Sequence, residues 1–139
     1  MEIILSRNHR GKPYQSMNGT LSIDGEIIAT AVESLSSLLP SGTYPLEVKK
    51  CPWAGRRMPV IINPRQAALP CSQCQKHPRC SLLMPGTSAK DCTAGSIIVG
   101  QSLIPGVVKQ SQATFDLLFE RIRKQVERGK TVCLTIENQ

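Results

Sequence analysis

The chain is poor in aromatic side chains and contains no long apolar run. Its 139 residues include one Trp, two Tyr and two Phe, so the core must be mostly aliphatic. No stretch reaches the ~20 apolar residues that a membrane-spanning helix needs. The N-terminal segment is continuously apolar only over residues 3–5 before it turns basic, which is not the pattern of a secretory signal peptide. We therefore expect cytosolic synthesis and no membrane span. A role outside the cell would require lysis, a secretion machinery or incorporation into a virion.

Internal repeats are also missing, and no cluster interleaves cations with aromatic rings. Seventeen cations against ten anions give a net charge of +7, but the cations are spread along the chain. Proteins that hold single-stranded nucleic acid combine such charge with stacking aromatics. The pattern therefore favours a solvated basic surface and leaves nucleic-acid binding as an alternative. With 40% apolar and 19% charged residues, the composition is that of one globular domain spanning residues 1–139.

Short strands dominate the predicted secondary structure. Ten Pro and ten Gly indicate many turns. Apolar runs and apolar–polar alternation predict strands at residues 3–7, 19–23, 26–33, 43–50, 58–63, 97–99 and 131–136. The pair Asp24-Gly25 suits a two-residue type I′ turn and predicts a hairpin between the second and third of these strands.

A single helix is predicted at about residues 111–128. Ser111 is expected to cap its N-terminus, and Gly129 has the residue type that commonly follows a helix C-terminus. Its predicted inward face has helical spacing and consists of Phe115, Leu118, Phe119, Ile122 and Val126. The expected fold is therefore mainly β with one flanking α-helix (α+β). It is a small sandwich-like or barrel-like domain in which the helix is followed by a C-terminal strand.

The decapeptide CSQCQKHPRC, residues 71–80, lies in a segment of about residues 65–91 that shows no periodicity. A long irregular segment inside a compact domain is usually functional or cross-linked. Thiolate and imidazole are preferred zinc ligands, and a C-x2-C turn can present two sulfurs to one ion. The sequence therefore predicts a metal site, for which zinc is favoured and an iron–sulfur cluster is an alternative. The predicted ligands are Cys71, Cys74, Cys80 and Cys92, with His77 as an alternative ligand.

Disulfides and reduced thiols are the competing explanations of the same cysteines. Six cysteines permit 15 pairings, but oxidation requires a destination outside the cytosol. Cys51 and Cys133 lie away from the decapeptide. They are expected to be packing residues or to form a single pair with each other.

Four segments resemble, in order, a family of small uncharacterised domains found in phages, prophages and bacterial genomes. The segments are GTLSIDGE (residues 19–26), LPSGTYPLEV (39–48), DCTAGSIIVG (91–100) and SQATFDLLFERI (111–122). The family typically reads GxLxIDGE, IPAGTYxV, IHxGNxxxDTxGCILVG and SRxAFxxL. The resemblance implies that the cysteine-rich stretch at about residues 65–91 contains an insertion into this domain.

The His and Gly-Cys pair of that family is in turn similar to the active-site motif of YkuD-type L,D-transpeptidases. In those enzymes a cysteine attacks a peptidoglycan peptide and a histidine activates the thiol. This chain departs from the motif, because Met84 stands at the histidine position and Ser96 at the cysteine position. Asp91 matches the family aspartate. The remaining catalytic candidates are Ser96, Cys92, His77 and Asp91, and the simplest expectation for Ser96 is a small residue entering a buried strand.

Three functions are open on this basis. The favoured one is a non-catalytic phage-type or prophage-type module, binding or structural, on a degenerate peptidoglycan-peptidase-like scaffold. Its partner would be peptidoglycan, a phage protein or a host protein. The second is an enzyme that acts on peptidoglycan peptides with rearranged catalytic groups. The third is a zinc-stapled protein that binds nucleic acid or a regulator.

Overall fold

The computed structural model describes residues 1–11, 15–63, 80–92 and 95–138. Its β-strands are β1 (Glu2–Gly11), β2 (Ser16–Ile23), β3 (Glu26–Ser34), β4 (Gly42–Cys51), β5 (Arg56–Ile61), β6 (Ser81–Met84), β7 (Ile97–Ile104), β8 (Val107–Lys109) and β9 (Val132–Asn138). Its helices are α1 (Ser111–Glu127) and the short 3-10 helices η1 (Leu35–Ser37) and η3 (Ala89–Asp91). The predicted α+β class and the C-terminal strand after the helix are confirmed.

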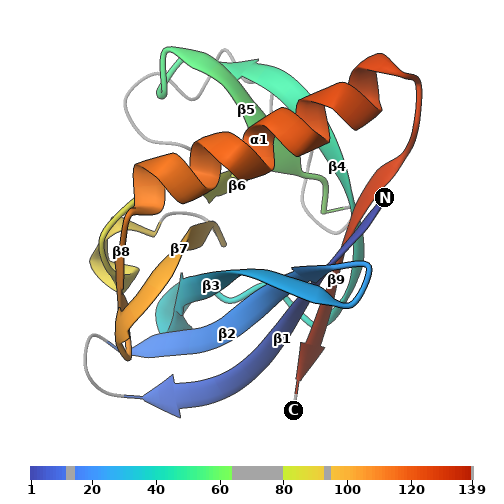
Figure 1. The fold of residues 1–139 in the computed structure, drawn as a ribbon. Helices are drawn as coiled ribbons and strands as arrows, with labels where there is room; N and C mark the ends of the chain where they lie inside the picture. The colour runs from blue at the N-terminus through green and yellow to red at the C-terminus, as the bar shows by residue number, and fades with distance from the viewer. Residues whose placement is uncertain (12–14, 64–79, 93–94, 139) are drawn as a thin grey trace.

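Eight strands close into a ring. The hydrogen-bonded order is β3-β2-β1-β9-β4-β5-β6-β7, and β7 pairs back onto β3, while β8 extends from β7. The pairs β1–β9 and β6–β7 are parallel and the others are antiparallel. The domain is therefore a small mixed barrel, with α1 lying across its outside (Figure 1). Ring closure removes most of the exposed strand edge that an open sheet would leave.

The core has two layers that follow from the alternation of each strand. Within the barrel, register places Ile3 opposite Ile23 and Leu5 opposite Leu21, and all four are almost fully buried. On the outside, Phe115, Leu118 and Ile122 of α1 are buried against the barrel. The other two residues of the predicted inward face are less buried: Phe119 is half-buried and Val126 is exposed.

The hairpin prediction is confirmed. Asp24 and Gly25 both have positive φ values, 52° and 82°, as a type I′ turn requires. The predicted helix C-terminus is confirmed as well, since Gly129 has φ 74° directly after the C-cap Arg128.

Two predictions about local structure are wrong. The irregular segment at about residues 65–91 contains β6 and η3. β6 was not recognisable because its four residues are all buried and show no alternation. Ser111 is not the N-cap of the helix: Gln110 occupies that position in the left-handed conformation, and Ser111 is the first helical residue. Within the described ranges, no helix is long and apolar enough to cross a membrane.

Candidate functional site

The motif that resembles the transpeptidase active site lies on β6 and β7. These parallel strands pair Met84 with Ile98, and Ser96 immediately precedes β7. Parallel pairing therefore brings the two positions that would carry a histidine and a cysteine onto neighbouring strands. Both side chains are buried, with 5% of Met84 and 1% of Ser96 exposed.

The Ser96 hydroxyl forms a hydrogen bond within the barrel. Its Oγ accepts a hydrogen bond of 3.0 Å from the backbone N–H of Leu82 on β6. This bond ties the start of β7 to the neighbouring strand and satisfies a buried amide, which is costly to leave unpaired. The expectation of a small residue entering a buried strand is confirmed. A substrate could not reach this oxygen without displacing the strand.

Asp91 also has a local structural role. Its Oδ2 accepts hydrogen bonds from the backbone N–H groups of Thr87 (2.8 Å) and Ser88 (3.2 Å). Together with the Ser88 side chain, which accepts from Lys90 N, it forms a capping box around η3. The aspartate shared with the family motif therefore shapes the turn between β6 and β7.

Cys92 follows directly and is half-buried. Its Sγ donates a hydrogen bond of 3.5 Å to the backbone oxygen of Val32 on β3. Burial raises the pKa of this thiol to about 12, and the nearby carboxylates of Glu33 and Asp91 add to the shift. A nucleophilic cysteine needs the opposite environment, one that favours the thiolate. Cys92 is therefore held as a thiol.

The predicted metal ligands are placed only in part. Cys71, Cys74 and His77 lie outside the described residues, and Cys80 is half-buried and packs against the core. Among the described residues, no group of three or more His, Cys, Asp or Glu side chains could hold a metal ion. Because Cys92 is engaged with Val32, a metal would have to compete for its sulfur.

Cys51 and Cys133 do not form the pair that was considered. Both are free thiols; Cys51 is buried at the end of β4 and Cys133 is half-buried on β9. Cys133 lies opposite Pro45, six positions before Cys51 along β4. At about 3.3 Å per strand residue the two backbones are about 20 Å apart, far beyond the reach of a disulfide. Packing is therefore the role of Cys51.

The Met84 side chain lines a small cavity of about 230 Å³ beneath the helix start. Arg56 lines it too, and its guanidinium lies over the rings of Phe115 and Phe119, 5.4 and 5.1 Å from their centroids. Cation–π contact of this kind stabilises a partly desolvated arginine. At this position the chain thus has a thioether, a phenyl ring and an arginine, a set that contains no general base.

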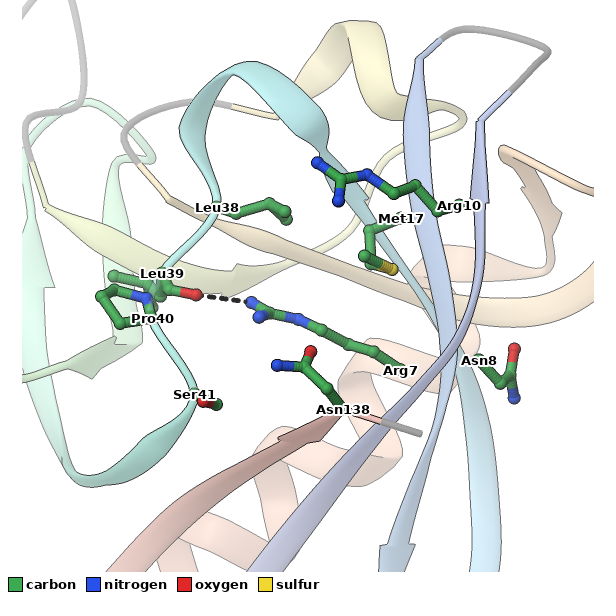
Figure 2. A pocket seen from close by; sticks show the side chains of 9 residues that line it. All are labelled: Arg7, Asn8, Arg10, Met17, Leu38, Leu39, Pro40, Ser41 and Asn138. Carbon is green, nitrogen blue, oxygen red and sulfur yellow. Dashed lines mark hydrogen bonds between the residues drawn. The ribbon is translucent and has the colours of Figure 1, made fainter.

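A larger cavity, of about 490 Å³, lies at one end of the barrel. Figure 2 shows Arg7 reaching across it toward Leu39, with Asn138 on one side of the guanidinium and Arg10 and Met17 on the other. Arg7 is only 4% exposed although it is charged. Its neighbours come from three parts of the fold: β1 and β2, the segment before β4, and the end of β9.

A bidentate ion pair holds Arg7 in place. Its Nε and Nη2 donate to the two carboxylate oxygens of Glu33 on β3 at 2.9 and 2.8 Å, and Nη2 also donates to the Leu39 backbone oxygen at 2.8 Å. Burial raises the pKa of the Glu33 carboxyl, and the hydrogen bonds and charge of Arg7 oppose that shift. Glu33 is 2% exposed, so the pair is enclosed by the barrel.

None of the predicted site residues that the structure describes lines this cavity, although the sequence contains a signal that Arg7 is buried. Ile3, Leu5 and Arg7 alternate along the first predicted strand, which directs Arg7 toward the core. A charge at an inward position predicts a buried partner, and Glu33 ends the third predicted strand. The cavity itself depends on strands far apart in the chain, so no local pattern reveals it.

Comparisons of the chain with protein-family models, with curated proteins and with solved structures find no match. The resemblance to the phage-associated family and to the transpeptidase motif therefore rests on the quoted segments alone.

Proposed function

We propose that the chain is a non-catalytic binding module of phage or prophage type, on a scaffold whose former catalytic positions now serve packing. The observation that carries this proposal is the environment of Ser96, whose buried Oγ accepts from Leu82 N. A nucleophile must be exposed to substrate and within hydrogen-bond reach of a base. The Ser96 oxygen is exposed by only 1%, and the motif's histidine position holds Met84.

The other catalytic candidates support the same proposal. Asp91 caps η3 and Cys92 is held in its thiol form by burial. The three catalytic candidates that the structure describes, Ser96, Asp91 and Cys92, therefore each have a structural partner. The ligand site on this module would be the cavity beside Arg7, where buried charge lies next to an opening. The partner class is peptidoglycan, a phage protein or a host protein.

The test of the proposal is an activity assay with murein tetrapeptides, read by mass spectrometry. We expect no new product from the native protein after prolonged incubation. The variants Ser96→Ala and Cys92→Ala would be run beside it. A product that one of these variants abolishes would identify that residue as a nucleophile and establish the enzymatic alternative instead.

A second assay concerns the partner. Co-sedimentation with insoluble murein sacculi would identify peptidoglycan as the ligand, and we expect retention that persists at moderate salt. Retention on heparin or DNA that falls steeply with salt is the behaviour of a phosphate-binding protein. That outcome, without binding to sacculi or to a protein partner, would favour the nucleic-acid alternative.

A further inference from the structure

We propose that the cavity beside Arg7 binds a monoanionic organic carboxylate that carries a small apolar group. The inference rests on the proposed function and specifies the ligand of that site. Four features of the cavity support it: the backbone of β1, the hydrogen bonds of Arg7, the charges of the lining and its apolar side chains.

A β-bulge in β1 brings two arginines to the same side of the strand. The β1–β2 register pairs Arg7 with Gly19 and Arg10 with Met17, and it skips Asn8 between them. In a regular strand, residues three apart point to opposite faces. The extra residue reverses this parity, so Arg7 and Arg10 both line the cavity. Bulges are frequent next to functional sites because they redirect side chains in this way.

Gly19 permits this geometry. A Cβ atom at Gly19 would collide with the backbone carbonyl of Ser6, so β1 and β2 could not approach as closely with any other residue there. This glycine is the first residue of the segment GTLSIDGE. The bulge lies directly after Arg7, the residue paired with Gly19.

Arg7 retains donor capacity toward the cavity. Its Nε and Nη2 are used by Glu33 and Leu39, whereas its Nη1 group has no hydrogen-bond acceptor among the residues that the structure describes. A guanidinium that is 4% exposed cannot satisfy those hydrogens by full hydration. Buried polar groups of this kind are almost always paired, so an acceptor in the cavity is expected.

The charges around the cavity favour a single negative charge on the ligand. Arg7 is neutralised by Glu33, and the other charged residue of the lining, among the residues that the structure describes, is Arg10, which is exposed. This described part of the lining, with Glu33, therefore carries a net charge of about +1. A carboxylate matches this charge and accepts hydrogen bonds from guanidinium and amide groups at once. Asn138 and Ser41 add further donors at the rim.

The apolar part of the lining favours an organic ligand over an inorganic anion. Met17, Leu38, Leu39 and Pro40 contribute apolar surface to the cavity. Small-molecule sites typically combine such surface with a few placed polar groups. Its volume of about 490 Å³ is enough for an acid with a short side chain. A free acid and the end of a peptide share this chemistry.

The first experiment is calorimetric titration of the whole chain with N-acetylleucine and its uncharged amide. We expect the acid to bind and the amide to bind at least about tenfold more weakly, because a charge-assisted hydrogen bond is lost. Acetate should bind about tenfold more weakly than N-acetylleucine, since it lacks the apolar group. The tripeptide Gly-Gly-Leu separates the two sources: tighter binding than N-acetylleucine indicates a peptide end, and weaker binding a free acid.

Variants localise the binding. Arg10→Gln should weaken the binding of N-acetylleucine about tenfold and leave the melting temperature almost unchanged, because Arg10 is exposed. Lys130→Gln is the matched control. It removes one positive charge from an exposed residue outside the cavity, and we expect native affinity.

Three results would overturn the inference. They are equal affinity for acid and amide, equal loss in the Arg10 and Lys130 variants, and no binding of N-acetylleucine up to about 10 mM. None of them concerns catalysis. A failed titration with no murein product would reject the carboxylate site and leave the non-catalytic module. A murein product together with binding of N-acetylleucine would reject the non-catalytic module and leave the carboxylate site.

Discussion

At the scale of single residues, the Arg7–Glu33 pair is the most consequential feature of the molecule. Two opposite charges are enclosed at one end of the barrel and satisfy each other through two hydrogen bonds. Breaking a buried pair leaves one charge without compensation, whereas replacing both partners removes the desolvation cost as well. The pair therefore couples β1 directly to β3, which is not its neighbour in the sheet because β2 lies between them.

Replacing one residue of the Arg7–Glu33 pair is expected to lower the free energy of unfolding more than replacing both. Glu33→Gln should lower the free energy of unfolding by about 3–5 kcal/mol, because Arg7 would stay buried without its countercharge. The double variant Arg7→Met with Glu33→Leu should lose much less. Urea unfolding of the variants measures both. Equal losses in the single and double variants would show that the pair contributes through packing alone.

The buried thiol of Cys92 makes the free energy of unfolding depend on pH. The folded thiol has a pKa of about 12 and the unfolded one an ordinary value of 9.0, so the folded state keeps its proton longer. This contribution to stability is complete below pH 9.0 and is lost as pH rises toward 12. We expect the unfolding free energy to fall over that range, and to fall less steeply in Cys92→Ala. Parallel curves for the two proteins would contradict the assignment.

At the scale of elements, Ser111 joins the helix to the barrel. Its hydroxyl donates to the backbone oxygen of Val99 on β7 at 2.5 Å and accepts from the backbone N–H of Gly86 at 2.9 Å. One oxygen thus connects the first residue of α1, the strand beneath it and the turn after β6. The residue type that suggested a helix cap is used here for a tertiary contact.

We predict that Ser111→Ala lowers the free energy of unfolding by about 1–3 kcal/mol, because it leaves a partly buried N–H and a C=O without their partner. The matched control is Ser102→Ala on β7, where the side chain is exposed and a change within about 0.5 kcal/mol is expected. Thermal or urea unfolding measures the difference. A loss of the same size in both variants would mean that the bridge contributes nothing specific.

At the scale of the whole molecule, closure of the barrel depends on a short contact between distant segments. β3 and β7 pair through Thr30 with Gly100, Ala31 with Val99, and Val32 with Ile98. Gly100 also allows β8 to approach, because a Cβ there would come within 2.7 Å of the Val108 side chain. The pairing with β7 therefore fixes the end of β3, where Glu33 follows the paired Val32.

Whether the cysteine-rich segment binds zinc or forms disulfides can be read from the mass of the whole protein. The spacing of Cys71, Cys74, Cys80 and Cys92, with His77 as an alternative ligand, predicts that native mass spectrometry will show a mass excess of one metal ion that a chelator removes. Thermal stability should fall with it. An intact mass lighter by a pair of hydrogens for each bond, with no metal, would establish disulfides instead.

The sequence by itself determined most of the strands, the hairpin and the helix, because alternation, turn residues and helical spacing are local properties. It also determined that the motif positions hold Met84 and Ser96. Only the tertiary structure decided that Ser96 bonds to Leu82, that Ser111 bridges β7 and the turn after β6, and that β6 and β8 are strands. Only it brought Arg7 and Arg10 to one cavity and Glu33 against Arg7, since a bulge and the pairing of distant strands set which side chains meet.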